Sequence, residues 1–137
     1  MPPRYFTLDE ANAVVEELRP VVEQMVEHRR RLVSAYAERE ALTEQAGSNG
    51  GDLTPTDFAA AEEELELQAS AVAACLEEIQ AAGALVKDVD EGLLDFPALR
   101  DGEEILLCWR FGESKIDYYH GADEGFAGRR PLFEADE

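Results

Sequence analysis

Lysine is scarce in this chain of 137 residues, which has 12 basic and 31 acidic residues and a net charge of −19. So negative a surface would repel a phosphate backbone and an anionic membrane, and we expect neither nucleic acid nor a membrane as a partner. Cysteine is also rare: Cys75 and Cys108 are too few for a disulfide framework. No apolar run approaches the length of a membrane span, and no signal-peptide pattern is present. We therefore expect a cytoplasmic protein with free thiols.

The chain nevertheless contains 45% hydrophobic residues, enough to build a core. Its length fits one domain covering residues 1–137. The pattern predicts an α+β fold with a long antiparallel helical hairpin (residues 7–83) and a small antiparallel sheet of three or four strands. The sheet region and a glycine-rich loop occupy residues 84–131, and an acidic tail follows at residues 132–137.

The first helix is expected to run from a capping box at Thr7-Leu8-Asp9-Glu10 to about residue 46, where glycines stop it. Apolar residues recur at spacings of three and four along this length, as a helix packed on one side requires. Pro20 lacks the N–H that an interior helical residue donates. Because the apolar register continues past Pro20, we predict a kinked but continuous helix.

The second helix is predicted to begin at Pro55, since proline favours the first helical position. Its apolar residues repeat every seven positions, which indicates a seam for another helix; they are Phe58, Leu65, Val72, Ile79 and Val86. The glutamates around residue 64 make its solvent face acidic, opposite the basic residues 28–31 of the first helix. The seam is larger than one small sheet can cover, which suggests a homodimer.

Residues 92–120 read as a three-stranded meander preceded by a short strand at 85–89. Asp101-Gly102 and Gly112-Glu113 each fit a two-residue turn. With both turns tight, three rows of side chains share one face; they are Leu94, Trp109 and Ile116, then Phe96, Leu107 and Tyr118, then Ala98, Ile105 and His120. Pro97 cannot donate a ladder hydrogen bond, so its strand should be an edge strand or carry a bulge.

The same register places Asp95, Cys108 and Asp117 in a row on the opposite face, with Arg110 diagonal to both acids. This row is either a surface charge ladder or a polar site built on a rigid sheet. It also places Cys108 and His120 on opposite faces, which argues against a thiol–imidazole pair.

Two further patterns suggest chemistry near the end of the chain. Glu113, His120 and Asp123 offer two carboxylates and an imidazole, which makes a divalent metal a candidate cofactor. The glycines of residues 125–130 could let backbone N–H groups converge on an anion, with Arg129 adding its charge. The alternative is that Arg129 pairs with a nearby acid, such as Asp117 or Asp123.

The chain resembles the family known as domain of unknown function 2203. The residues that carry the resemblance are Tyr5–Asn12, Val86-Lys87-Asp88, Gly92–Pro97, Leu107–Arg110, Gly112-Glu113, His120 and Gly125–Arg129. The resemblance covers nearly the whole chain, and it implies no particular activity.

Two functions remain open from the sequence. The leading hypothesis is a non-enzymatic interaction or assembly module that forms a homo-oligomer, or binds a protein partner, through its long helices. The alternative is a small-molecule or metal-dependent enzyme with a site around His120, Asp123 and Arg129. The candidate binding residues are Trp109, Arg110, Tyr118, His120 and Arg129.

Overall fold

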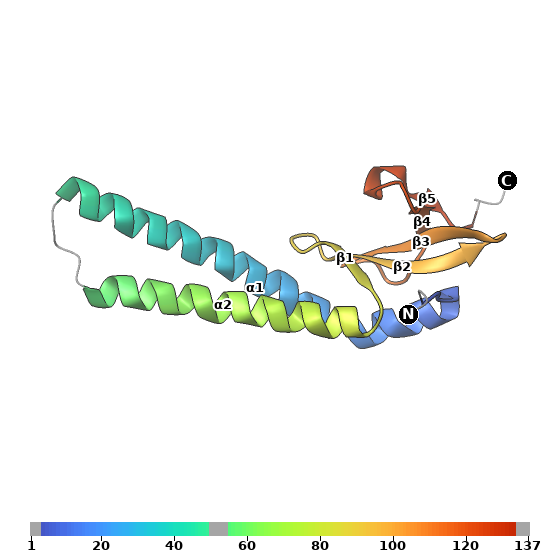
Figure 1. Ribbon diagram of the computed structural model, residues 1–137, viewed down its shortest axis with the longest axis horizontal. Helices are drawn as coiled ribbons and strands as arrows, with labels where there is room; N and C mark the ends of the chain where they lie inside the picture. The colour runs from blue at the N-terminus through green and yellow to red at the C-terminus, as the bar shows by residue number, and fades with distance from the viewer. Residues whose placement is uncertain (1–3, 50–54, 134–137) are drawn as a thin grey trace.

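The computed structural model describes residues 4–49 and 55–133, and it shows an α+β fold in which a helical hairpin precedes an antiparallel sheet (Figure 1). The elements are α1 (Leu8–Asn49), α2 (Pro55–Ala81), β1 (Leu85–Asp88), β2 (Leu93–Arg100), β3 (Glu103–Arg110), β4 (Tyr118–Gly121), the 3₁₀ helix η1 (Phe126–Gly128) and β5 (Arg130–Pro131). Strands that follow each other in the chain are neighbours in the sheet. The predicted fold class is confirmed, but the sheet has five strands rather than three or four.

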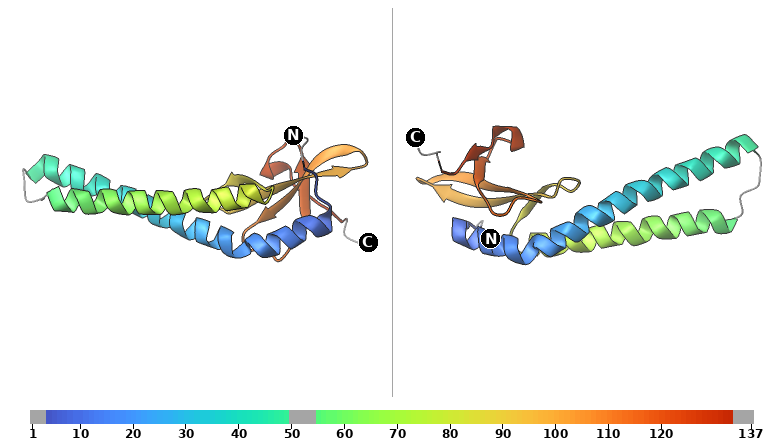
Figure 2. Two further views of the ribbon diagram at one scale, coloured as in Figure 1. Left: turned by 60° about the horizontal axis from the view of Figure 1, so that its bottom comes forward. Right: turned by 180° about the vertical axis from the view of Figure 1, so that it is seen from behind.

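The helical hairpin begins as its capping box predicts. The Thr7 hydroxyl accepts from the backbone N–H of Glu10 at 3.1 Å, and the Glu10 carboxylate accepts from the backbone N–H of Thr7 at 2.8 Å. α1 remains helical through Pro20, and Figure 2 shows that its axis bends within its blue part. α1 continues to Asn49, so the expected end at about residue 46 is wrong and Gly47 does not stop the helix. The glycines at 50–51 and the tail at 134–137 lie outside the described residues.

The core lies between the helices and one face of the sheet. The buried side chains of α1 at this face are Ala11, Val15, Leu18, Val22 and Met25. They meet the sheet residues Leu94, Phe96, Leu107 and Trp109, as well as Val72, Cys75 and Ile79 of α2. Trp109 is completely buried. The Trp109 face of the sheet therefore packs on the helices.

The hairpin of β2 and β3 has the predicted register, with Leu94 opposite Trp109 and Phe96 opposite Leu107. Its turn has positive φ at both Asp101 (53°) and Gly102 (81°). A type I′ turn requires this conformation, and it matches the twist of the flanking strands.

Pro97 lies in an inner strand, but the sheet is open beside it. β1 pairs only with residues 93–95 of β2, so no β1 residue needs a hydrogen bond from Pro97. The N-terminal segment lies here instead: the backbone N–H of Phe6 donates to the carbonyl of Pro97 at 2.8 Å. The Phe6 ring meets Phe96 edge to face, with centroids 5.3 Å apart. The edge-strand prediction therefore holds locally, beside Pro97, and not for the whole strand.

The predicted register of β3 with β4 is wrong by one residue. Leu106, and not Ile105, lies opposite His120, and Leu107 lies opposite Tyr119. The reason is the connection, which spans residues 111–117 rather than two residues. Its turn is centred one residue earlier than predicted, because the Glu113 N–H donates to the Arg110 carbonyl at 2.9 Å.

α1 holds the rest of this connection in place. The Ile116 N–H donates to the Asn12 side chain at 2.8 Å, and Arg19 donates to the carbonyls of Glu113 and Ser114. Ile116 is buried in the core as expected, but it reaches the core without pairing to β3. A shift of one residue reverses every side chain of a strand, so His120 and Tyr118 leave the Trp109 face and Tyr119 takes their place.

The segment after β4, red in Figure 1, lies on the side of the sheet away from α1. The segment predicted as a glycine-rich loop contains the 3₁₀ turn η1 followed by β5, which pairs with β4. Phe126 of η1 lines a hollow together with Leu93 and Arg110. The segment thus covers part of the sheet face that does not touch the helices.

Candidate functional site

Three polar side chains meet on the outer face of the sheet, the face turned away from the helices. They are Asp95 of β2, Cys108 of β3 and His120 of β4, which we call the D-C-H cluster. One ligand-type atom from each lies within 4.8 Å of the other two. All three residues are buried, with exposed fractions of 1%, 0% and 2%. Asp95 lies directly opposite Cys108 in the ladder, and His120 is diagonal to Cys108 on the next strand.

The hydrogen bonds of His120 define where its protons lie. Its Nδ1 is 2.9 Å from the backbone carbonyl of Gly121. A carbonyl can only accept, so Nδ1 carries a proton. Its Nε2 is 3.0 Å from both carboxylate oxygens of Asp95. A contact this short between a nitrogen and a carboxylate needs a hydrogen between them, so Nε2 and the carboxylate share one.

Burial changes the acidity of the other two members of the cluster. The pKa of Asp95 is raised, chiefly because its charged form is desolvated, although the neighbouring imidazole partly opposes this. The pKa of the Cys108 thiol is raised from 9.0 to about 12 by burial and, next, by the negative charge of Asp95. Cys108 is therefore a thiol at neutral pH, and without a further cation it is not a nucleophile.

A second charged pair lies beside the cluster. The Nη2 atom of Arg129 donates to both carboxylate oxygens of Glu113, at 3.0 and 2.9 Å. The guanidinium also lies over the rings of Tyr118, at 3.9 Å from the centroid, and Phe126, at 4.6 Å. Its Nε is the one buried side-chain polar atom without a hydrogen-bond partner within residues 4–49 and 55–133. Arg129 therefore pairs with a local acid, as the alternative expectation had it, but the acid is Glu113 and not Asp117 or Asp123.

The predicted binding residues are divided between the two faces of the sheet. Trp109 belongs to the core and donates through Nε1 to the Glu113 carbonyl at 3.0 Å. Arg110 is half exposed and pairs with Glu91, not with Asp95 or Asp117. Tyr118, His120 and Arg129 lie together on the outer face.

The predicted metal ligands Glu113, His120 and Asp123 do not converge. Glu113 is engaged by Arg129, His120 faces Asp95, and Asp123 is exposed. In the part of the chain that the structure describes, the set that brings three metal-ligand atoms together is the D-C-H cluster. The expectation that Cys108 and His120 occupy opposite faces is wrong, because it depended on the two-residue turn. The sequence pattern placed Asp95 beside Cys108. The contact of Asp95 with His120, however, depends on the length of the connection between β3 and β4.

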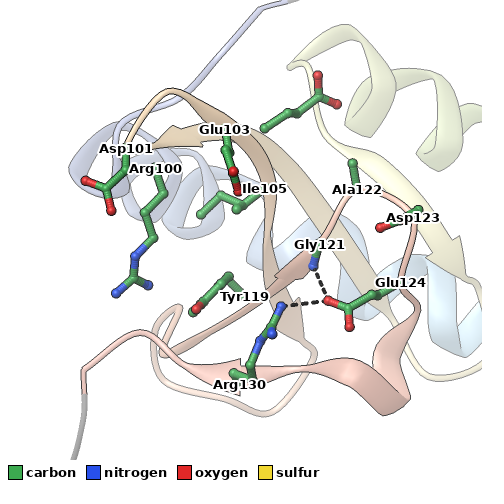
Figure 3. Close-up of a pocket in the computed structure, with 11 residues that line it drawn as sticks. Arg100, Asp101, Glu103, Ile105, Tyr119, Gly121, Ala122, Asp123, Glu124 and Arg130 are labelled. Carbon is green, nitrogen blue, oxygen red and sulfur yellow. Dashed lines mark hydrogen bonds and ion pairs between the residues drawn. The ribbon is translucent and has the colours of Figure 1, made fainter.

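A separate hollow of about 590 Å³ opens at the far end of the β2–β3 hairpin (Figure 3). Arg100 and Arg130 flank the ring of Tyr119, with centroid distances of 4.6 and 5.1 Å. Glu124 holds Arg130 at 2.6 Å and accepts from the Gly121 N–H at 2.8 Å. Asp123 lies on this rim, whereas His120 and Arg129 do not line the hollow.

None of the described helices combines the length and the apolar character needed to cross a membrane. Comparison with curated proteins and with solved structures finds no match. A family model described as "Uncharacterized conserved protein (DUF2203)" matches residues 4–132. Since this match covers almost the whole chain, the protein belongs to the DUF2203 family.

Proposed function

We propose that this protein is an assembly module that pairs with a second copy of itself through the distal arm of its helical hairpin, residues 30–49 and 55–67. The arm begins where His28 Nδ1 meets the side-chain oxygen of Gln68 at 2.7 Å. Twenty residues of α1 at 1.5 Å each give it a length of about 30 Å. Figure 1 shows this green end of the hairpin projecting away from the sheet.

The observation that supports the proposal is the small core of the distal arm. Its buried apolar cluster consists of Leu32, Ala35 and Leu65. Val33, Tyr36 and Leu67 are exposed to 49%, 55% and 61% of their surface. A helical hairpin has one internal seam, and a second hairpin would bury apolar surface that the first leaves in water.

The arginines of the distal arm offer partners for the acidic α2 of a second copy of the same chain. The arm part of α1 carries three arginines and three glutamates, whereas that of α2 carries five acidic residues and no basic one. Arg39 and Glu62 already pair across the hairpin at 2.7 Å. A hollow of about 580 Å³ between the helices is lined by both signs of charge, including Arg31 and Glu64. In a two-fold dimer, the arginines of α1 in each copy would face the acidic α2 of the other, so each favourable contact is made twice.

The enzymatic alternative has less support from the geometry. Its residues point to different places: His120 to Asp95, Arg129 to Glu113, and Asp123 to the rim of the open hollow. Catalysis needs reacting groups within hydrogen-bond reach of one substrate position. These three side chains do not share one.

Sedimentation velocity over a wide concentration range tests the proposal. The full-length protein is expected to be a dimer at micromolar concentration, and a Val33→Glu/Tyr36→Glu variant to dissociate at least about tenfold more readily, corresponding to about 1.4 kcal/mol. Leu99→Glu is the matched control, because Leu99 is as exposed as Tyr36, at 55%, but lies at the end of β2 in the sheet.

The control should leave the dimer unchanged. A wild-type chain that remains monomeric at all concentrations would contradict the proposal. An equal loss of dimer in Leu99→Glu would instead place the interface on the sheet and exclude the distal arm.

A further inference from the structure

The D-C-H cluster is a buried group of nitrogen, sulfur and oxygen donors that the assembly function does not use. We propose that Asp95, Cys108 and His120 bind one divalent cation of the zinc class between strands β2, β3 and β4. The proposal is independent of the distal arm, because the cluster lies on the sheet and none of its residues belongs to α1 or α2.

The spacing of the donors suits such an ion. In a tetrahedral zinc site the bonds are about 2.0–2.3 Å long, which places neighbouring ligand atoms about 3.3–3.8 Å apart. The three donor atoms of the cluster lie within 4.8 Å of one another, and Nε2 is 3.0 Å from the Asp95 oxygens. Side-chain adjustments of up to about 1 Å would close the set on an ion.

The orientation of His120 is the one that metal-binding histidines adopt. Its Nδ1–H is held by the Gly121 carbonyl at 2.9 Å, which leaves Nε2 directed into the cluster. A histidine ligand commonly donates its other ring N–H to a carbonyl in this way, because that bond fixes the tautomer and the ring plane. The backbone thus prepares His120 as a neutral nitrogen donor.

The charges also balance. When the cation binds, the proton shared by Asp95 and His120 leaves, and so does the Cys108 thiol proton. One carboxylate and one thiolate then neutralise a charge of +2, so the buried site is uncharged when the cation is bound. Thiolate and imidazole donors favour zinc and similar ions over magnesium and calcium, which prefer oxygen alone.

Three protein donors leave a fourth coordination position for a water molecule or small anion. Arg129 is close enough for its charge to lower the pKa of Cys108, and its buried Nε has no partner among the described residues. A fourth ligand at the ion would be placed beside this unused donor. Arg129, held by Glu113, is therefore expected to position that ligand and not to bind the metal.

The test uses the full-length protein, freed of metal with a chelator and titrated with Co²⁺ under reducing conditions. Co²⁺ binds at zinc sites in place of Zn²⁺. When a cysteine is one of its ligands, the complex has a sulfur-to-metal charge-transfer band in the near ultraviolet. We expect saturation at one Co²⁺ per chain, with this band and with visible bands of tetrahedral intensity, and loss of the bands on adding Zn²⁺.

The two cysteines supply a matched pair of variants. Cys75 is buried in the helical core, and Cys75→Ser should keep the charge-transfer band. Cys108→Ser, checked for folding by circular dichroism, should lose it. The Val33→Glu/Tyr36→Glu variant should bind Co²⁺ like the wild type even if it no longer dimerises, which separates this proposal from the assembly function.

Two results would overturn the inference. The first is a folded wild-type protein that shows no saturable binding of Co²⁺. The cluster would then be a hydrogen-bonded polar pair beside a thiol, and this result requires no variant. The second is a charge-transfer band that persists in Cys108→Ser, which would place the metal at another cysteine.

Discussion

The body of this protein and its distal arm share the same two helices but bury them differently. In the body, defined as the sheet with the helical residues up to 28 and from 68 onward, a third layer covers the hairpin. Met25, Ile79 and Trp109 there are completely buried. In the arm, the most enclosed apolar side chains are Leu32, Ala35 and Leu65, exposed to 8%, 3% and 6%. The comparison shows that helical sequence alone makes a long hairpin, but a closed core needs a further layer.

The largest predicted effect compares one substitution in the two regions. Leu94→Ala removes a side chain that is fully buried between sheet and helices, and we expect it to lower the free energy of unfolding by about 4 kcal/mol. Leu65→Ala in the arm should cost about 2 kcal/mol, because solvent and neighbouring side chains can fill the space. Urea denaturation followed by circular dichroism measures both. Equal costs would show that the arm core is as closed as that of the body.

A second comparison concerns charged pairs. His120→Gln replaces the imidazole beside buried Asp95 with an amide that cannot take up the shared proton, and we expect a loss of about 3 kcal/mol in metal-free protein. The double variant Asp95→Asn/His120→Gln should cost clearly less than the sum of the single changes, because the two residues act as one unit. Arg39 and Glu62 of the arm are closer, at 2.7 Å, yet each is about half exposed.

The same double-variant cycle on Arg39 and Glu62 should give a coupling below about 1 kcal/mol, since water screens the exposed pair. Urea denaturation at pH 7 measures both cycles. A larger coupling in the arm than in the body would reverse our assignment of which pair is shielded from solvent.

The third prediction uses alkaline pH. The Cys108 pKa is about 12 in the folded protein and 9.0 for an unperturbed thiol. The unfolded chain therefore loses this proton first as the pH rises, and the stability that the protonated thiol provides is lost between pH 9 and 12. Relative to Cys108→Ala, the metal-free wild type should become less stable by about 1.4 kcal/mol between pH 8 and pH 10. A difference that stays constant over this range would contradict the raised pKa.

The smallest predicted effects have opposite signs in the two regions. Thr7→Ala removes the cap at the start of α1, and we expect a loss of about 1 kcal/mol. In the arm, the Thr43 hydroxyl only donates to the Arg39 carbonyl one turn earlier. Thr43→Ala should therefore leave stability unchanged or raise it by up to about 0.7 kcal/mol, as alanine is the better helix former. Thermal unfolding of the two variants checks both signs.

Local signals were sufficient to predict most of the fold. The capping box at Thr7, the helix through Pro20 and the turn at Asp101-Gly102 depend on a few adjacent residues, and each was predicted correctly. The pairing of β2 with β3 followed from that turn. β5 was missed because two residues without alternating hydrophobicity give no strand pattern.

The candidate site was missed for a different reason. Asp95 and Cys108 were correctly placed side by side, but His120 was assigned to the wrong face. Its position depends on how Asn12 and Arg19 hold the connection between β3 and β4, and both belong to α1, about a hundred residues earlier in the chain. No pattern within the meander could reveal contacts with such a distant segment.

The seven-residue connection between Arg110 and Tyr118 has a consequence for anyone who edits or compares chains of this kind. Inserting or deleting one residue there would turn β4 over, placing His120 among the apolar side chains and Tyr119 beside Cys108. Every original side chain would still be present, yet the D-C-H cluster would be gone. In grafting, alignment or redesign of this segment, the number of residues between Cys108 and His120 therefore matters as much as their identities.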